Sequence, residues 1–193
     1  IASNCIVQNN FIHDVDGGGI VLELGGDISD LVPFRNNNFS SNLIERCGDP
    51  LYIRNNDEDE EVAEAFGEMT IDNNIILDTG YGWYENQPSY INPAFYTGHS
   101  QNVLNYYGEA EKDGQSVKVT NNIFCRAYHS LMYFSPTTDN PSCEDNNIYV
   151  QNYGKTVVET SGAVVKATQP DEIYKGLESL HINSKEIIVL KPE

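Results

Sequence analysis

Five short segments centred on asparagine recur along the chain and constrain its fold more than any other feature. They read CIVQNNFIHDV, NFSSNLIERC, MTIDNNIILDT, VKVTNNIFCRA and CEDNNIYVQN, and each joins two alternating runs through an Asn turn. One asparagine of each segment is taken as equivalent, and these are Asn10, Asn42, Asn74, Asn122 and Asn147. Successive members are separated by 32, 32, 48 and 25 residues. Helical hairpin repeats do not tolerate such uneven steps, whereas a solenoid absorbs them as loops beside otherwise identical coils.

The pattern predicts an all-β protein, a right-handed single-stranded parallel β-helix of about five coils with a C-terminal cap. Asparagine adopts positive φ at low cost, so we expect these residues to bend the chain and their stacked side chains to hydrogen-bond between coils. Residues 1–168 form the coils. Residues 169–193 have no turn Asn and contain Pro170, so we expect them to leave the coil pattern and cover the last coil. No capping segment is visible before Cys5, so we expect the first coil to pair with missing N-terminal coils or with another copy of the chain.

Length and charge limit the partners. The 193 residues fit one domain with a sizeable core. The chain has 11 Lys and Arg against 29 Asp and Glu, a net charge of −18, which repels nucleic acid, anionic lipid and polyanionic glycans unless calcium bridges the two. No stretch approaches the roughly 20 apolar residues of a membrane span. We therefore expect no nucleic acid partner and no membrane span.

The four cysteines are predicted to be free thiols. None has the CxxC spacing of zinc or redox sites, and each stands at a different distance from its turn Asn, so disulfides between coils are not indicated. We interpret these cysteines as small apolar side chains that fill the core. They are Cys5, Cys47, Cys125 and Cys143.

A column of alternating charge lies four residues after the turn asparagines. Its members are Asp14, Arg46, Asp78 and Arg126. Opposite charges on neighbouring strands favour one register, so we interpret the column as structural rather than catalytic. We expect His13, His129 and His181 at the surface, because none has an evident carboxylate or nucleophile partner in the sequence.

Each coil is predicted to have a third strand after a corner, and loops gather on both sides of the sheet that these strands form. We place the third strands at residues 20–24, 51–54, 94–97, 131–134 and 156–158. Loops on a rigid scaffold are where binding surfaces are built, so the groove over this sheet is the candidate site. Alternation directs Glu23 outward in the first coil and Tyr52 and Arg54 outward in the second, with Glu23 and Arg54 about 4.8 Å apart on neighbouring strands.

Aromatic side chains suggest a sugar ligand for this groove. The tract GYGWYENQPSYINPAFY brings Trp83 and Tyr96 beside the groove, and His99 follows it closely. The alternative is that Glu23 and Arg54 form only a surface ion pair, worth at most about 1 kcal/mol. The acidic run DEDEE at residues 57–61 is interpreted as a solvated face, with a calcium site as the alternative. We otherwise expect no metal and no cofactor.

The strings GGGIVLELGGD, NNNFSSNLI and AFYTGH resemble those of secreted bacterial right-handed β-helix repeat proteins of the pectin-lyase-like superfamily. In that group a G-G-D loop follows one strand and an A-F-Y-T-G strand comes two coils later. The resemblance covers residues 12–98, with weaker similarity up to residue 158, and GLESLHINS is similar to a segment near the end of such helices. It implies a β-helix in the extracellular space or periplasm. Some members resemble glycoside hydrolases such as fucosidases or xylanases, which implies a polysaccharide or oligosaccharide partner.

This chain departs from the group at one place. An acidic pair in a form like D-D-A-G usually precedes A-F-Y-T-G, and here the same place reads Ile91, Asn92, Pro93. If that pair supplies catalysis in active members, this chain has lost it. His99 stands where an Arg is common. The matching positions that remain are Gly25, Gly26, Asp27, Tyr96, Thr97 and Gly98.

Two functional hypotheses follow. In the first, the chain is a secreted glycoside hydrolase, which usually needs two carboxylates about 5–9 Å apart. The candidates for its acid and its base or nucleophile are Asp16, Glu23, Asp27 and Asp49, and the candidates for substrate binding are Arg54, Tyr52, Trp83, Tyr96 and His99. In the second, the protein binds glycan without catalysis or serves as a structural stalk. A calcium-dependent polysaccharide lyase is a third hypothesis.

Overall fold

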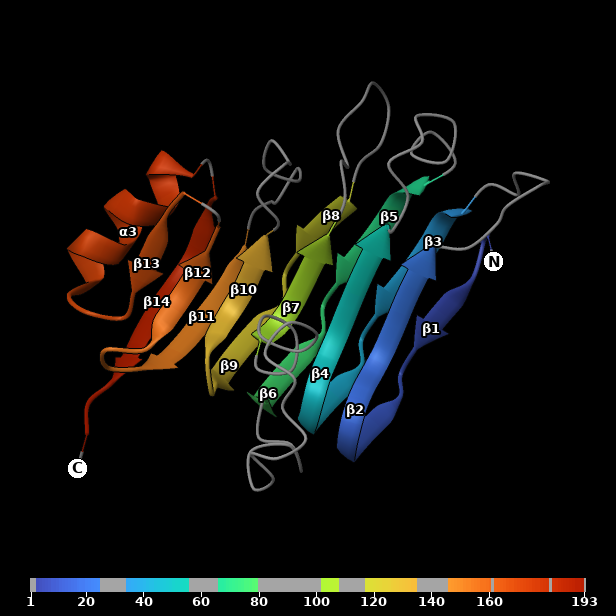
Figure 1. Ribbon diagram of the computed structural model, residues 1–193, viewed down its shortest axis with the longest axis horizontal. Helices are drawn as coiled ribbons and strands as arrows, with labels where there is room; N and C mark the ends of the chain where they lie inside the picture. The colour runs from blue at the N-terminus through green and yellow to red at the C-terminus, as the bar shows by residue number, and fades with distance from the viewer. Residues whose placement is uncertain are drawn as a thin grey trace.

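The computed structural model describes residues 3–24, 34–55, 66–79, 102–107, 117–134, 146–160, 162–180 and 182–192. Over these ranges the protein is mostly β-structure in parallel sheets, with a single helix near the C-terminus (Figure 1). The strands of the five Asn-centred segments lie side by side in chain order. We number these repeats 1 to 5, and the described parts of repeat 1 and repeat 2 are residues 3–24 and 34–55.

The smaller sheet, sheet A, takes one short strand from each of the first four repeats. In spatial order these are β1 (Ile6–Gln8), β3 (Phe34–Ser40), β5 (Phe66–Asp72) and β8 (Val117–Thr120). All three pairings are parallel, and their registers follow the spacing of the asparagines.

The larger sheet has two branches that share the long strands β2 (Phe11–Leu24) and β4 (Leu43–Asn55). The first branch continues from the first halves of these strands through β6 (Ile75–Thr79), β9 (Ile123–Ala127), β11 (Asn147–Asn152) and β14 (Ser184–Leu190). The second branch continues from their second halves through β7 (Asn102–Tyr107), β10 (Ser130–Phe134), β12 (Thr156–Glu159) and β13 (Val164–Lys166). Each described pairing is parallel except that of β12 with β13.

Apolar columns on the inner faces of the sheets form the core. They arise because successive residues of a strand face opposite sides, so every second residue points inward. In the first branch, the rings of Phe124 and Tyr149 are buried and stack with their centroids 5.7 Å apart. The other buried members include Ile44 and Ile76 in the first branch, Phe39, Ile71 and Val119 in sheet A, and Leu51, Met132 and Val158 in the second branch.

A ladder of asparagine side chains joins the five repeats between sheet A and the first branch. The Oδ1 atom of Asn74 accepts hydrogen bonds from the backbone N–H and the Nδ2 of Asn42, both at 3.0 Å. The Nδ2 of Asn74 donates to Phe39 O at 2.9 Å and to Asn122 Oδ1 at 3.0 Å. The same pattern runs from Asn10 to Asn147. The predicted hydrogen bonds between stacked asparagines are therefore confirmed.

The bend itself is made by the residue before each ladder asparagine, so the prediction that the ladder residues take positive φ is wrong. The positive φ angles of 56° to 73° occur at Asn9, Ser41, Asn73, Asn121 and Asn146. These side chains are exposed, whereas four of the five ladder asparagines are buried. Adjacent positions thus have different roles, because the outer residue supplies the left-handed backbone and the inner one supplies the buried hydrogen bonds of the ladder.

The prediction that residues 94–97 form the third strand of repeat 3 is wrong. β7 takes this place, because it pairs with residues 51–54 of β4 on one side and with β10 on the other. Leu104 holds the register position between Leu51 and Met132, both of which are buried. Residues 94–97 lie outside the described residues. The other four predicted third strands are confirmed, within β2, β4, β10 and β12.

The C-terminal segment combines a covering helix with one more parallel strand. Helix α3 (Pro170–Ser179) starts with proline in its first turn, a favoured position, and buries Ile173 and Leu177 against the neighbouring strands β13 and β14. β14 pairs in parallel with β11, so the prediction that all of residues 169–193 leave the coil pattern is wrong for residues 184–190. In the part of the chain that is described, no helix has the length and apolar character needed to cross a membrane.

Candidate functional site

Two columns of polar and aromatic residues cross the second branch. In one, Glu23 of β2 is the register partner of Arg54 of β4, and Arg54 is the partner of Tyr107 of β7. The predicted stacking of Glu23 and Arg54 on neighbouring strands is therefore confirmed at the level of the backbone. Tyr107 was not predicted, because the sequence hypothesis put the third strand of repeat 3 elsewhere.

The second column lies two residues earlier along the strands. Tyr52 pairs with Asn105, Asn105 with Tyr133, and Tyr133 with Glu159. Sequence reasoning found only Tyr52 in this set. The signal for Asn105 was available in the alternating string NVLNYY, whose even-numbered apolar residue Leu104 continues the core column.

The burial of β10 and β12 shows which part of this surface can be reached. Leu131 and Val157 are buried, and Val157 lies two residues before Glu159 on β12. Glu159, two residues further, has a side chain that is 27% exposed. On β12, the side chain that solvent reaches is therefore that of its last residue, Glu159.

The catalytic candidates fall into separate groups. Asp49 pairs with Gly18, two residues after Asp16, at an irregularity in the register between β2 and β4. Glu23 lies five residues beyond Gly18 along β2. Asp27, Trp83, Tyr96 and His99 lie outside the described residues. The structure thus brings the backbones of Asp16 and Asp49 close together and places Glu23 further along the same strand.

A second polar cluster joins the residue before β10 to the last residue of β12. His129 Nε2 is 2.8 Å from Glu159 Oε2, with the His129 side chain 45% exposed. Beside it, Lys155 donates from Nζ to Tyr128 O at 2.9 Å and lies 4.6 Å from the centroid of the Tyr128 ring. Sequence reasoning missed this cluster, because Glu159 lies 30 residues after its histidine.

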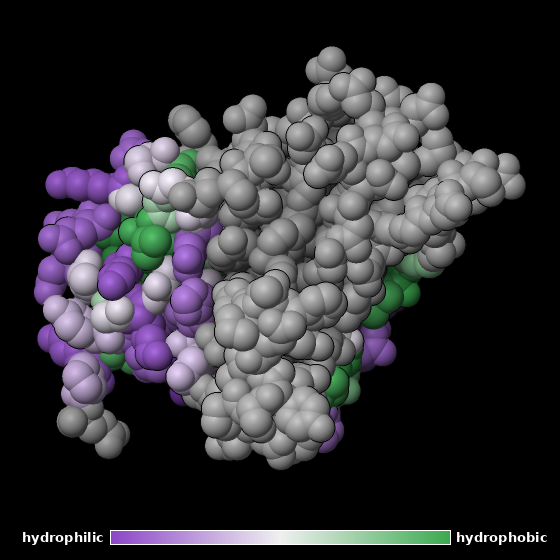
Figure 2. Space-filling view, viewed as in Figure 1, coloured by the Kyte–Doolittle hydropathy of each residue, from purple (hydrophilic) through white to green (hydrophobic). Residues whose placement is uncertain are grey.

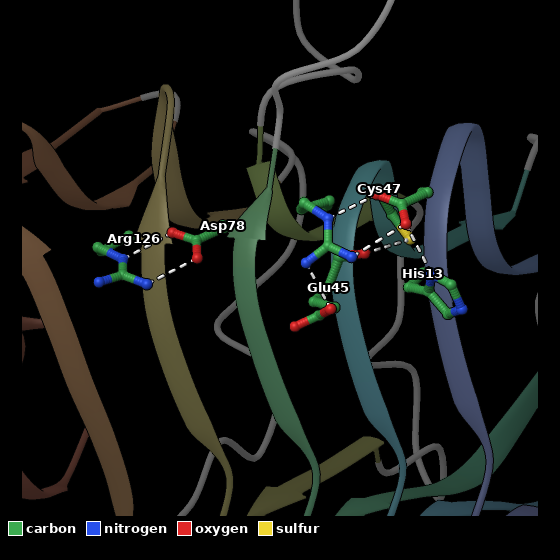
Figure 3. Close-up of polar contacts among 7 residues, drawn as sticks. His13, Glu45, Cys47, Asp78 and Arg126 are labelled. Atoms are coloured by element: carbon green, nitrogen blue, oxygen red, sulfur yellow. Dashed lines mark hydrogen bonds and ion pairs between the residues drawn. The ribbon is translucent and has the colours of Figure 1, made fainter.

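The alternating charge column forms ion pairs between neighbouring repeats (Figure 3). Arg46 binds Asp14 through two contacts, Nε to Oδ1 at 2.5 Å and a second nitrogen to Oδ2 at 2.9 Å. His13 Nδ1 lies 2.7 Å from the same carboxylate, and Glu45 accepts from Arg46 as well. The hydrogen bonds from Arg46 and then His13 hold the pKa of Asp14 well below its usual range, and the pKa of Arg46 is raised.

The second pair of the column repeats this geometry. Arg126 donates from Nε and from a terminal nitrogen to the two oxygens of Asp78, each at 2.6 Å. All four members of the column have φ between 51° and 55°, so they also form the left-handed corner of each repeat. The structural interpretation of the column is supported. The prediction that His13 and His129 lack carboxylate partners is wrong, and His181 lies outside the described residues.

Among the residues that the structure describes, the cysteines and acidic side chains do not assemble into a metal site. Cys5, Cys47 and Cys125 are free thiols, as predicted, and Cys143 lies outside the described residues. Burial raises the pKa of the Cys47 and Cys125 thiols, which suits a packing role. No group of three or more His, Cys, Asp or Glu that could hold a metal ion occurs within the described ranges. The acidic run at residues 57–61 lies outside them.

Comparisons with known proteins assign neither a family nor a function to the chain. No family model matched the chain, and neither the curated proteins nor the solved structures gave a match.

Proposed function

We propose that this chain is a secreted carbohydrate-active protein, built as a right-handed parallel β-helix, that binds a polysaccharide or oligosaccharide over the second branch. The observation that carries the proposal is the register of the second branch, which aligns Tyr52, Asn105, Tyr133 and Glu159 across four neighbouring strands. The second column, of Glu23, Arg54 and Tyr107, runs beside it.

The chemistry of these columns suits a sugar better than other ligands. Tyrosine rings cover the apolar face of a pyranose, while amide, guanidinium and carboxylate groups exchange hydrogen bonds with its hydroxyls. The net charge of −18 disfavours nucleic acid and anionic lipid. The proposed fold is supported by the parallel registers that follow the asparagine spacing, and its right hand by the strong preference of parallel connections for that hand.

Within this function we favour glycoside hydrolysis by Asp16 and Asp49. Neighbouring strands lie about 4.8 Å apart and residues rise about 3.3 Å, so these two Cα atoms are roughly 8 Å apart. Carboxylates on such positions can reach the separations used by retaining or inverting enzymes. Glu23 with Asp27 is the second candidate pair. Asp49 is too far from Glu23 to be its partner, since five residues of strand measure about 16 Å.

The non-catalytic alternative keeps the same surface. In the second branch, the register of Glu23 with Arg54 favours an ion pair, which would remove this carboxylate from acid or base catalysis. The protein would then be a glycan-binding or structural module. A calcium-dependent lyase is the least supported hypothesis, since such an enzyme needs a basic residue over a cluster of carboxylates, and within the two described columns Arg54 is the one basic residue.

A panel of plant and host glycans tests the proposal by measuring both binding and the release of reducing sugar. Tyr52→Ala and Tyr133→Ala should each weaken binding by roughly 1–3 kcal/mol, as for loss of an aromatic anchor. Tyr174→Ala is the matched control, because Tyr174 is exposed on α3 and belongs to neither column. Trp83→Ala tests the aromatic tract in the same way. Equal effects at Tyr52 and Tyr174 would contradict the site.

Carboxamide variants separate the hydrolase from the binding module. Asp16→Asn and Asp49→Asn should abolish sugar release and leave binding nearly unchanged. Asp171→Asn on α3 is the control and should change neither sugar release nor binding. If sugar release persists in both variants and is lost in Glu23→Gln, the second candidate pair is correct. If the parent protein binds without releasing sugar, the non-catalytic alternative holds.

A further inference from the structure

The contact between His129 and Glu159 places a proton-transfer group at one end of the second column. Glu159 is the last member of that column, and its Oε2 lies 2.8 Å from His129 Nε2. His129 precedes β10, and its side chain is 45% exposed, so solvent and ligands can reach it. Imidazole is the side chain that most often transfers protons in catalysis. The proposed glycan surface does not yet give this histidine a role.

The carboxylate of Glu159 determines which nitrogen of His129 is basic. An ionised carboxylate only accepts hydrogen bonds, so the neutral ring carries its hydrogen on Nε2, the nitrogen that faces Glu159. The lone pair is then on Nδ1. Among the residues that the structure describes, Glu159 is the one hydrogen-bond partner of the His129 side chain, which leaves Nδ1 open to a ligand. A proton taken up at Nδ1 makes the ring a cation, and the adjacent carboxylate stabilises that cation.

A lysine lies beside the backbone of the same histidine. Lys155 Nζ donates to Tyr128 O at 2.9 Å, and this carbonyl belongs to the peptide bond that joins Tyr128 to His129. Nζ also lies 4.6 Å from the centroid of the Tyr128 ring, which attracts the cation. An ammonium group has three hydrogens, so within the described part of the chain two remain for a ligand. The cluster thus combines a basic nitrogen with a positive charge.

An apolar side chain borders Glu159 on the strand opposite β10. Val164 of β13 is the register partner of Glu159, and it is 52% exposed. Figure 2 shows this end of the molecule as mainly hydrophilic, with one hydrophobic patch in the region where Figure 1 draws α3 and β13. A ligand that fits these residues therefore has a polar group for His129 and Lys155 and a small hydrocarbon group for Val164.

We propose that His129 and Lys155 hydrolyse an acyl ester on a sugar hydroxyl, such as an O-acetyl group. This inference rests on the proposed function, because the second column holds the sugar whose ester reaches the cluster. Water attacks the carbonyl carbon and gives a proton to His129 Nδ1, while the Lys155 ammonium donates to the carbonyl oxygen as it becomes negative. The bond from the carbonyl carbon to the sugar oxygen then breaks, and that oxygen takes the proton from Nδ1. The products are a carboxylic acid and a free sugar hydroxyl.

An acyl ester fits this cluster better than a glycosidic bond does. It has a carbonyl oxygen for the ammonium and a hydrocarbon end for the exposed valine. Cleavage of a glycosidic bond usually needs two carboxylates, whereas the one carboxylate of this cluster is bound to a histidine. Glu159 acts through His129 and is therefore a positioning residue, while His129 is the catalytic base.

Acetate release by the 193-residue chain tests the proposal, with O-acetylated xylan and 4-nitrophenyl acetate as probes. His129→Gln should lower kcat by at least about 100-fold, which is what a general base contributes, and should leave the circular dichroism spectrum unchanged. His13→Gln is the matched control, because His13 is also 45% exposed and also lies beside a carboxylate. It should keep the parent rate. Lys155→Gln should lower kcat by about 100-fold or more, as for loss of an oxyanion donor.

Two further measurements distinguish catalysis from a surface ion pair. Glu159→Gln should lower kcat at least about tenfold with KM unchanged, because the ring loses its fixed tautomer. A merely structural contact would change the melting temperature and leave kcat as it was. Acetate release should also rise from about pH 5 to about pH 8, since an imidazole accepts a proton only in its neutral form.

Glycan binding separates failure of this inference from failure of the proposed function. If Tyr52→Ala weakens glycan binding but the parent chain hydrolyses neither ester, the ester inference is overturned and the glycan surface stands. Equal rates in His129→Gln and His13→Gln also overturn it. If hydrolysis of 4-nitrophenyl acetate depends on His129 while Tyr52→Ala leaves glycan binding unchanged, the catalytic cluster is supported and the glycan surface is wrong.

Discussion

Each buried asparagine of the ladder satisfies both its own polar atoms and those of its neighbours. Asn74 accepts two hydrogen bonds and donates two in a site where its side chain is 2% exposed. A buried amide is costly without partners, and here every partner is another repeat or its backbone. The identity of this residue is therefore fixed by hydrogen bonding, whereas its exposed neighbour is fixed only by backbone conformation.

Asn74→Ala should lower the free energy of unfolding by about 3–5 kcal/mol. The substitution leaves the N–H and amide of Asn42 without their acceptor, and each orphaned buried group costs roughly 1–3 kcal/mol. Asn73→Ala, one residue earlier, should cost only about 1 kcal/mol, for the positive φ of an exposed residue. Urea unfolding followed by circular dichroism measures both. Equal losses at the two positions would contradict this division of roles.

The Asp14 ion pair predicts a dependence of stability on acid pH. The pKa of Asp14 is lowered below its usual 3.8 in the folded protein, so its contribution is complete above that pH and is lost as pH falls through the folded pKa. The melting temperature of Arg46→Gln should therefore lie below that of the parent at neutral pH, and the difference should shrink in strong acid. High salt should reduce it too, because both side chains are about half exposed. A constant difference from neutral pH to strong acid would show that the pair does not act electrostatically.

At the scale of strands, regular repetition made most of the fold readable from the sequence. The asparagine spacing located the turns, and four of the five third strands were placed correctly. The misplaced strand falls within the largest step in spacing, where the string AFYT was taken as the third strand and NVLNYY forms it. β14 was missed because its pairing with β11 is not signalled by a turn asparagine.

The candidate site was less predictable than the fold. The pairing of Glu23 with Arg54 follows from counting residues, but Tyr107 and Asn105 depend on the position of β7. The contact of His129 with Glu159 joins residues that are 30 positions apart in sequence, and His129 belongs to no repeated column. Side-chain contacts at corners depend on three-dimensional placement, which periodicity does not determine.

Close packing of β2 on β4 predicts that Gly19 cannot be replaced. A Cβ atom at Gly19 would lie 2.8 Å from Pro50 O and 3.3 Å from Ile44 Cγ2, so the strands would have to separate. Gly19→Ala should cost about 1–3 kcal/mol of stability. Gly162→Ala, where nothing lies within 4 Å of the added atom, should change it by less than about 0.5 kcal/mol. Urea midpoints of the two variants check this, and a tolerant Gly19 would mean that the two strands are not held as closely as described.

Helix α3 stabilises the end of the sheets through its buried face. Leu177→Ala should lower the free energy of unfolding by about 2–5 kcal/mol, since the side chain is 1% exposed. Tyr174→Ala, on the exposed face of the same helix, should have an effect within about 0.5 kcal/mol. Thermal unfolding distinguishes the two, and similar losses would indicate that the orientation of the helix differs from the one described.

At the scale of the whole molecule, charge predicts which glycans bind. A protein of net charge −18 should bind neutral glycans with little dependence on salt and should not bind polygalacturonate in the absence of divalent ions. Addition of calcium should allow the anionic polymer to bind, if carboxylates of the protein and of the polymer share the ion. Binding of the polymer in chelator at low salt would contradict this expectation.

The step of 48 residues between Asn74 and Asn122 has the same ladder geometry as the steps of 32 residues. The hydrogen bonds across it measure 2.9 and 3.0 Å, and those between Asn42 and Asn74 measure 3.0 Å. The geometry of the ladder is therefore independent of the number of residues that connect two neighbouring repeats. Such a molecule can exchange, lengthen or acquire whole connecting segments while its frame stays the same, so new recognition surfaces can be grafted onto it one connection at a time.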